Sequence, residues 1–179
     1  MSFKIFVDAD SMMPAMRAII LRRAVKGNIE TVFASDRLLK DVEEAMKNHT
    51  VQLRAPLRQV LDRSEIRKVR SSIRMALVPQ GKDSADDYII SLADEDSLVI
   101  SHDIPLLSRA IEKGAAAIDD RGNVYTKENI RTRLSERDVN GILREMQVFD
   151  EKTKRFDART VEKFANAFDS MITSLSVQK

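Results

Sequence analysis

The chain has 179 residues, of which 43% are hydrophobic and 32% charged, a composition typical of a globular protein with one sizeable core. It has no cysteine and two histidines, which excludes disulfides and thiolate metal sites and leaves oxygen ligands, the kind that Mg²⁺ and Mn²⁺ prefer. The net charge of +2 does not by itself indicate a polyanion partner. The apolar runs are too short to cross a membrane, and the N-terminus lacks a signal-peptide segment, so we expect a cytoplasmic protein without membrane association.

The first half of the chain alternates short apolar runs with amphipathic stretches. In order, it predicts a strand at 3–8, a helix at 13–26, a strand at 29–34, a helix capped by Ser35 or Asp36, a short strand at 51–53 and a basic helix at 57–73. The segment 54–74 carries seven basic residues against two acids, whereas 83–103 carries seven acids and neither lysine nor arginine. This arrangement suits an enzyme that holds a polyanion near metal ions, and it equally suits two solvated surfaces.

The second half continues the alternation. It predicts a strand at 75–78, a helix opened by Asp83, a strand at 98–100, a helix at 104–113 closed by Gly114, a strand at 115–118, a turn at 119–123, helices from Thr126 and over 138–146, a polar linker at 150–157 and an amphipathic helix at 158–176. We therefore expect an α/β protein with three layers, α/β/α, around a mostly parallel sheet. The whole chain, 1–179, reads as one domain with a basic helical elaboration at 39–74 and extra C-terminal helices.

Acidic residues follow three of the predicted strands. They are Asp8 and Asp10 after the first strand, Asp83, Asp86 and Asp87 after the strand at 75–78, and Asp103 after the strand at 98–100. Because parallel strands end at one edge of the sheet, these carboxylates are expected to converge there, and a divalent cation would relieve their repulsion. We assign Asp8, Asp10, Asp87 and Asp103 as metal ligands, with Asp86 or Asp87 completing the site or orienting the attacking water.

Each acid also has a structural interpretation. Asp83, Asp86 and Asp103 fit helix caps or first-turn acids, and Asp10 fits a cap for the helix at Met13. Asp8 is the hardest to explain this way, because it directly ends a buried strand. Four more residues are candidates for binding substrate or water: Ser11, Arg22, Ser101 and Arg121. His102 reads as a polar surface residue.

Five motifs, in order, resemble a known family. They are 8–10 (DAD), 83–89 (DSADDYI), 101–106 (SHDIPL), 120–126 (DRGNVYT, with 129–130 and 133–134) and 164–169 (FANAFD). Together they resemble the YaiI/YqxD-like family of uncharacterised bacterial proteins, which is grouped with PIN-like nuclease domains. The resemblance implies a PIN-like fold and an acidic metal site at Asp8, Asp10, Asp86 or Asp87, and Asp103. The chain departs from that family in having Met12-Met13 where Cys-Pro is usual, and in a longer 39–74 segment.

The resulting functional hypothesis is a Mg²⁺- or Mn²⁺-dependent nuclease that acts on single-stranded or structured RNA more readily than on DNA. One alternative is a haloacid-dehalogenase-like phosphatase, with Asp8 as the nucleophile and Asp10 as the acid/base. Another is a non-catalytic module of the same fold that binds RNA or protein. The basic 39–74 segment is compatible with a nucleic-acid clamp or a dimerisation arm, so a homodimer stays open.

Overall fold

A mostly parallel sheet forms the centre of the molecule. The computed structural model describes residues 3–81, 84–145 and 157–177, with side chains omitted for 138–145. The strands run in the order β3-β2-β1-β4-β5-β6; β1 to β5 are parallel, and β6 is antiparallel to β5. Their bounds are Lys4–Asp8, Glu30–Ser35, Ile73–Leu77, Ser97–Ile100, Ala116–Ile118 and Val124–Tyr125 for β1 to β6. The strand order reverses between β1 and β4, the place where α/β proteins commonly bind ligands.

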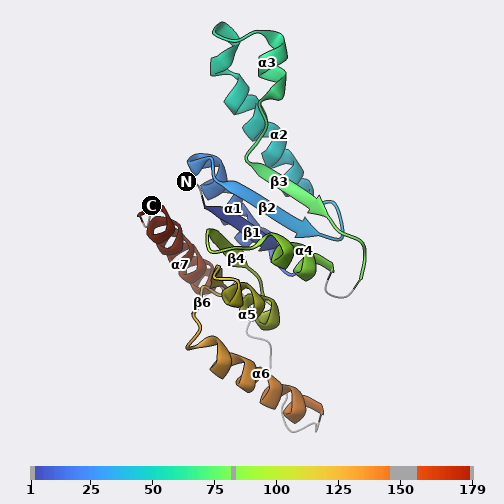
Figure 1. Ribbon diagram of the computed structural model, residues 1–179, viewed down its shortest axis with the longest axis vertical. Helices are drawn as coiled ribbons and strands as arrows, with labels where there is room; N and C mark the ends of the chain where they lie inside the picture. The colour runs from blue at the N-terminus through green and yellow to red at the C-terminus, as the bar shows by residue number, and fades with distance from the viewer. Residues whose placement is uncertain (1–2, 82–83, 146–156, 178–179) are drawn as a thin grey trace.

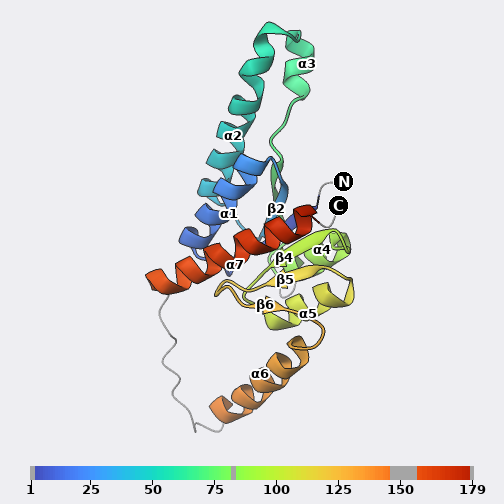
Figure 2. The ribbon, with the colours of Figure 1, turned by 90° about the vertical axis from the view of Figure 1, so that its left-hand side faces the viewer.

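Helices cover both faces of this sheet (Figures 1 and 2). The helices are α1 (Pro14–Gly27), α2 (Lys40–Arg54), α3 (Arg63–Lys68), α4 (Ser84–Leu92), α5 (Ile104–Glu112), α6 (Ile130–Glu145) and α7 (Ala158–Val177), with a 3₁₀ turn at Pro56–Gln59. Side chains of α1, α2 and α7 join one buried cluster, and those of α4 and α5 join the other. This confirms the predicted three-layer α/β/α arrangement. No helix in the described ranges combines the length and apolar character that crossing a bilayer requires.

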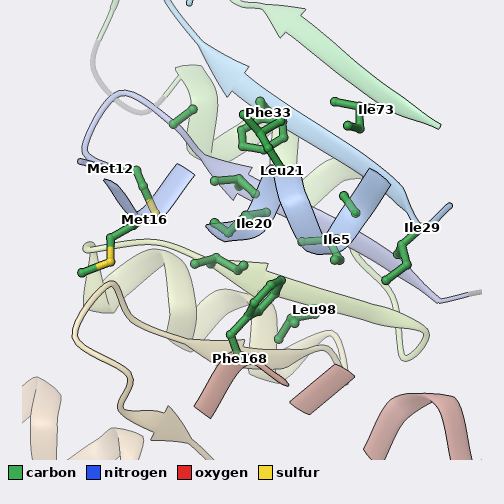
Figure 3. Close-up of a cluster of buried hydrophobic side chains, with 14 of the residues drawn as sticks. Ile5, Met12, Met16, Ile20, Leu21, Ile29, Phe33, Ile73, Leu98 and Phe168 are labelled. Carbon is green, nitrogen blue, oxygen red and sulfur yellow. The ribbon is translucent and has the colours of Figure 1, made fainter. Parts of the chain in front are cut away.

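The period-two pattern of the strands creates the two cores. In β1, Ile5 and Val7 join the cluster on the α1–α7 side, whereas Phe6 joins the cluster of α4 and α5. Figure 3 shows the first of these clusters, with Ile5 among its residues. On α7, Phe164 and Phe168 are fully buried and stack with ring centroids 5.7 Å apart. Burying a phenylalanine side chain contributes about 2–3 kcal/mol, so α7 is an integral layer of the fold.

The segment after β2 differs most from the sequence-based expectation. Ser35 is the last residue of β2, and α2 begins at Lys40 without a side-chain cap, so the capping role predicted for Ser35 or Asp36 is wrong. Residues 51–53 lie inside α2 and form no strand. The predicted helix at 57–73 is reduced to the 3₁₀ turn and α3, which ends at Lys68. The alternation of Val51 and Leu53 with Gln52 suggested a strand, but α2 continues through these residues to Arg54.

The α2–α3 segment projects away from the sheet as an arm (Figures 1 and 2). The N-terminus of α3 is fixed by a capping box between Asp62 and Glu65. Arg54 of α2 donates from Nη2 to the carbonyl oxygens of Arg67 and Val69, at 3.1 and 2.9 Å, which returns the chain toward β3. Arg70 also donates to the carbonyl oxygen of Arg67, so two arginines of the basic segment hold the arm together internally.

Two further differences lie in the second half. The short antiparallel strand β6 was not predicted. The helix expected from Thr126 begins at Ile130 and continues through the stretch assigned to a separate helix from 138. Asp83, Met146 and residues 150–156 of the predicted linker lie outside the described residues.

Candidate functional site

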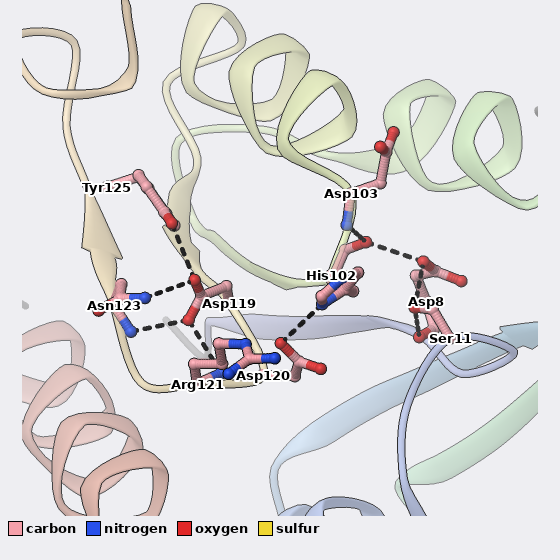
Figure 4. Close-up of polar contacts among 10 residues, drawn as sticks. Asp8, Ser11, His102, Asp103, Asp119, Asp120, Arg121, Asn123 and Tyr125 are labelled. Carbon is pink, nitrogen blue, oxygen red and sulfur yellow. Dashed lines mark hydrogen bonds and ion pairs between the residues drawn. The ribbon is translucent and has the colours of Figure 1, made fainter. Parts of the chain in front are cut away.

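The polar residues of interest gather at the carboxyl ends of β1, β4 and β5 (Figure 4). Asp8 is the last residue of β1, and Ser101 and Asp103 follow β4, which lies beside β1 in the sheet. The structure thus brings together residues that are more than 90 positions apart in sequence, at the reversal of strand order.

Asp8 is a buried carboxylate with only 7% of its surface exposed. Its Oδ2 accepts hydrogen bonds from Ser11 Oγ at 2.7 Å and from Ser101 Oγ at 2.8 Å. Burial raises the pKa of Asp8 above its usual value; the two serine hydroxyls partly offset this, and the nearby charges of Asp10 and Asp103 raise it further. A charged group in this position is therefore strained electrostatically and would gain from a cation.

Asp10 bonds to residues at the end of β2, the strand on the other side of β1 from β4. Its carboxylate accepts hydrogen bonds from Ser35 Oγ at 2.6 Å and from the backbone N–H of Asp36 at 2.8 Å. Arg37 Nε lies 3.8 Å from Asp10 Oδ1 in a largely exposed pair. Asp10 thus joins the loops after β1 and β2, and it is not the cap of α1, whose capping residue Met13 provides no side-chain bond.

Asp103 is linked to Asp8 through Ser101. The fully buried Ser101 Oγ donates to Asp8 and accepts the backbone N–H of Asp103 at 2.9 Å. Asp103 also caps α5, since its Oδ2 accepts the N–H of Leu106 at 3.3 Å. Its Oδ1 lies 3.4 Å from Arg137 Nη2 of α6. Asp103 is therefore both the cap of α5 and a neighbour of Asp8.

Three other predicted site residues lie on α4 and α1. Asp87 is exposed on α4 and pairs with Arg109 Nη2 of α5 at 2.7 Å, and Asp86 is half-buried on the same helix. Arg22 lines a separate hollow of about 550 Å³ between α1 and α7, together with Arg23 and Lys26. Because α1 runs antiparallel to the strands, its last turns lie toward their amino ends, away from Asp8.

Asp119, directly after β5, organises a tight turn. It is 5% exposed, and its two oxygens accept four hydrogen bonds: from the N–H groups of Arg121 and Asn123, from Asn123 Nδ2 and from Tyr125 Oη, at 2.7–2.9 Å. Burial, followed by the charge of Asp119, raises the pKa of Tyr125 to about 12. This carboxylate is saturated by its own turn.

Gly122 fits the same turn against α7. Its φ of +75° favours glycine, and a Cβ there would lie 2.8 Å from the backbone of Lys163 and Phe164. Lys163 Nζ also donates to Asn123 Oδ1 at 2.6 Å. The turn at 119–123 is therefore rigid, which fixes the backbone of Arg121.

A histidine and a buried carboxylate form a further pair. His102 Nδ1 lies 3.0 Å from Asp120 Oδ1, and Asp120 is 2% exposed. The hydrogen bond to Asp120 raises the pKa of His102 above its ordinary value. The sequence interpretation of His102 as a plain surface residue missed this contact, which joins two loops and has no local sequence signal.

These loops and α6 enclose a hollow of about 350 Å³. We call it the α6 hollow; its polar walls include His102, Asp103, Arg121, Tyr125, Arg133 and Arg137. Arg133 and Arg137 were not predicted as site residues, although their spacing of four on a helix places them on one side. Arg121, which also lines the hollow, was predicted to bind substrate, and that role stays a prediction.

The donor set determines which metal the acids could hold. Among the described residues, no three histidine or carboxylate side chains are arranged as a ready-made metal cage. Mg²⁺, however, is commonly bound through one or two carboxylates, with water and substrate phosphate as its other ligands. Asp8, with Asp10 or Asp103 nearby, offers oxygen donors of the kind that such a water-rich site uses, and their role as Mg²⁺ or Mn²⁺ ligands stays a prediction.

Comparison with known proteins identifies relatives along the chain. A model of the family described as "Uncharacterized BCR, YaiI/YqxD family" matches residues 42–174. A UPF0178 protein of Desulfotalea psychrophila is 37% identical over 172 residues, which cover 96% of this chain and 99% of that protein. A UPF0178 protein of Pseudomonas entomophila is 30% identical over 97% of this chain and 98% of its own length. One from Geobacter metallireducens is 33% identical over 79% of this chain and 91% of that protein.

Proposed function

The chain belongs to the YaiI/YqxD family of uncharacterised proteins, and from that premise we propose that it is a metal-dependent nuclease. Its substrate in this proposal is RNA, and its site is the edge of the sheet formed by Asp8, Asp10 and Asp103. The preference for RNA and the PIN-like character follow from the family resemblance of the motifs.

One observation carries the proposal: a buried carboxylate is kept beside two other carboxylates at the strand-order reversal. Asp8 is penalised by burial and by the charges of Asp10 and Asp103. A protein seldom retains such an arrangement for stability alone, because buried unpaired charge is costly. A bound cation would attract the three carboxylates and remove their mutual repulsion. Carboxylates with perturbed pKa values are also frequent at functional sites.

Each residue has a distinct role in the proposed reaction. Asp8, Asp10 and Asp103 would hold Mg²⁺ or Mn²⁺, which supplies charge neutralisation and an activated water for phosphodiester hydrolysis. Ser101 positions Asp8 and the backbone of Asp103 at once. Ser11 holds the same Asp8 oxygen as Ser101 (Figure 4). Arg121 would contact a substrate phosphate from the rigid turn.

The phosphatase alternative receives less support from the same geometry. In that reading, Asp119 and Asp120 after β5 would complete the metal site. Asp119 is instead saturated by four hydrogen bonds from its own turn, and Asp120 is bonded to His102. We therefore retain phosphatase activity as a control assay only.

The decisive experiment combines Mn²⁺ titration calorimetry with cleavage of single-stranded RNA. Wild type is compared with Asp8→Asn and with Asp169→Asn, a matched charge removal at an exposed position on α7. We expect metal binding and metal-dependent cleavage by wild type and Asp169→Asn, and loss of both in Asp8→Asn. Wild type that binds no Mn²⁺ would overturn the proposal, and hydrolysis of a small phosphomonoester without RNA cleavage would favour the phosphatase. RNA binding unaffected by metal removal, without cleavage, would indicate a non-catalytic module.

A further inference from the structure

We propose that the α6 hollow binds the terminal phosphomonoester of a short nucleic-acid strand. The proposed function supplies only the position of the neighbouring scissile phosphodiester, beside Asp8 and Asp103. The hollow itself follows from its own residues, which come from three separate parts of the chain: the loop after β4, the turn after β5 and α6. Its space of about 350 Å³ accommodates a phosphate group and part of the attached nucleoside.

Four nitrogen-bearing side chains line the hollow. His102 comes from the loop after β4, Arg121 from the turn after β5, and Arg133 and Arg137 from one side of α6. Arginine forks match phosphate oxygens in pairs, and several of them around one hollow favour a dianion over a singly charged diester. A terminal phosphomonoester carries that dianionic charge near neutral pH.

The ion pairs that Arg133 and Arg137 make are easily exchanged. Arg133 Nη1 lies 2.8 Å from Glu136 Oε2, with both side chains about half exposed (50% and 51%). Arg137 pairs with Asp103 at 3.4 Å, also at partly exposed positions. Exposed pairs of this kind contribute on the order of 0.2–1 kcal/mol, so a phosphate with several charge-assisted hydrogen bonds can displace them.

The acids around the hollow compete little with a phosphate. Asp119 directs its oxygens to four donors of its own turn, including the hydroxyl of Tyr125. Asp120 is buried behind His102 and orients its ring through Nδ1. Asp103 and Glu136 are the other acids that line the hollow. Asp103 is engaged as the cap of α5 and pairs with Arg137, so Glu136 is the acid whose removal should help an anion to bind.

The position of the hollow indicates a nucleic-acid end as its ligand. Asp103 belongs both to the hollow and to the acidic site, since it contacts Arg137 and is linked through Ser101 to Asp8. A strand whose terminal phosphate sits among the arginines would pass its next phosphodiester toward those acids. The inferred substrate class is therefore a short oligonucleotide with a phosphorylated end.

The test measures binding without cleavage. Three single-stranded RNAs of one sequence, with an internal fluorophore, carry a 5′-phosphate, a 3′-phosphate or hydroxyls at both ends. Their affinities are measured by fluorescence anisotropy in EDTA for wild type, Arg133→Ala/Arg137→Ala and the control Arg22→Ala/Arg23→Ala, which changes the other basic hollow. Thermal melts verify that each variant is folded.

We expect wild type to bind one of the phosphorylated RNAs about tenfold more tightly than the hydroxyl RNA. Inorganic phosphate should abolish this difference, as should the Arg133/Arg137 double variant, while the Arg22/Arg23 control keeps it. Equal binding of all three RNAs by wild type, or a preference that persists in the Arg133/Arg137 variant, would overturn the proposal.

A second variant predicts a gain in affinity, which a folding defect would not produce. Glu136→Gln removes the competing acid and should raise affinity for the phosphorylated RNA about twofold, without changing affinity for the hydroxyl RNA. Unchanged affinity for both RNAs would count against the hollow. If the end preference is found but no metal-dependent cleavage, the hollow stands and only the nuclease proposal fails.

Discussion

Two buried carboxylates at the same edge of the sheet are treated in opposite ways. Asp119, after β5, accepts four hydrogen bonds and anchors a rigid turn. Asp8, at the end of β1, receives two serine hydroxyls on one oxygen, and burial and neighbouring acids raise its pKa. The carboxylate of Asp119 stabilises the fold, whereas the charged form of Asp8 lowers the stability of the metal-free protein. Burial of an acid therefore does not identify function; the balance of donors around it does.

The largest effect should come from removing the stabilising carboxylate. Asp119→Ala leaves buried donors, including Tyr125 Oη, without their acceptor, and should lower the free energy of unfolding by about 2–4 kcal/mol. Urea unfolding measures this loss. Asp119→Asn is the matched control, since its Oδ1 can still accept the N–H groups of Arg121 and Asn123, and it should lose less. Wild-type stability in Asp119→Ala would refute the structural role.

Asp103→Asn tests the acidic site with little change in stability. Asparagine caps helices about as well as aspartate, so α5 should keep its N-terminus and the melting temperature should stay within about 1 °C. Loss of the charge should reduce metal-dependent RNA cleavage by about 100-fold or more, if Asp103 is a ligand. Cleavage rates and melts on the same preparation separate the two properties. Retained cleavage would remove Asp103 from the metal site.

Asp8→Asn should stabilise the metal-free protein at neutral pH. Because the pKa of Asp8 is raised, the stability linked to this group is fully present below its ordinary value near 3.8 and is lost as pH rises through the raised value. Melting temperatures in EDTA should therefore be a few degrees higher for the variant at pH 7 and equal to wild type at pH 3.5. A lower melting temperature for the variant at pH 7 would contradict the unfavourable burial of Asp8.

The smallest effect concerns Arg137, which lies between the acidic site and the α6 hollow. Its guanidinium, 3.4 Å from Asp103, opposes a cation at that carboxylate. Arg137→Ala should therefore raise the affinity for Mn²⁺ about twofold in calorimetry, as expected for a partly exposed pair. Arg109→Ala, which removes the partner of Asp87 on α5, is the control and should leave that affinity unchanged. Weaker Mn²⁺ binding in Arg137→Ala would show that Arg137 supports the metal site.

Part of the site could be predicted because it depends on local pattern. Asp8, Asp10 and Asp103 lie at or just after the ends of apolar runs that were interpreted as buried parallel strands, so their placement at one edge followed from the alternation of elements. Asp87 was assigned to the same site from its position after a strand. The rotation of α4 decides where its side chain points, and it points to Arg109. That rotation depends on packing against α5, which no local pattern specifies.

The sequence by itself determined the alternation of strands and helices, the two apolar faces of β1, the α7 stripe of Phe164 and Phe168, and the family. The structural features follow from the pattern of apolar residues, which acts over neighbouring positions, and the family follows from the sequence motifs. Only the tertiary structure decided the strand order that places β4 beside β1, the Ser101 bridge between Asp8 and Asp103, and the approach of α6 to the acidic edge. Such contacts join residues far apart in sequence, and they are set by how whole elements pack.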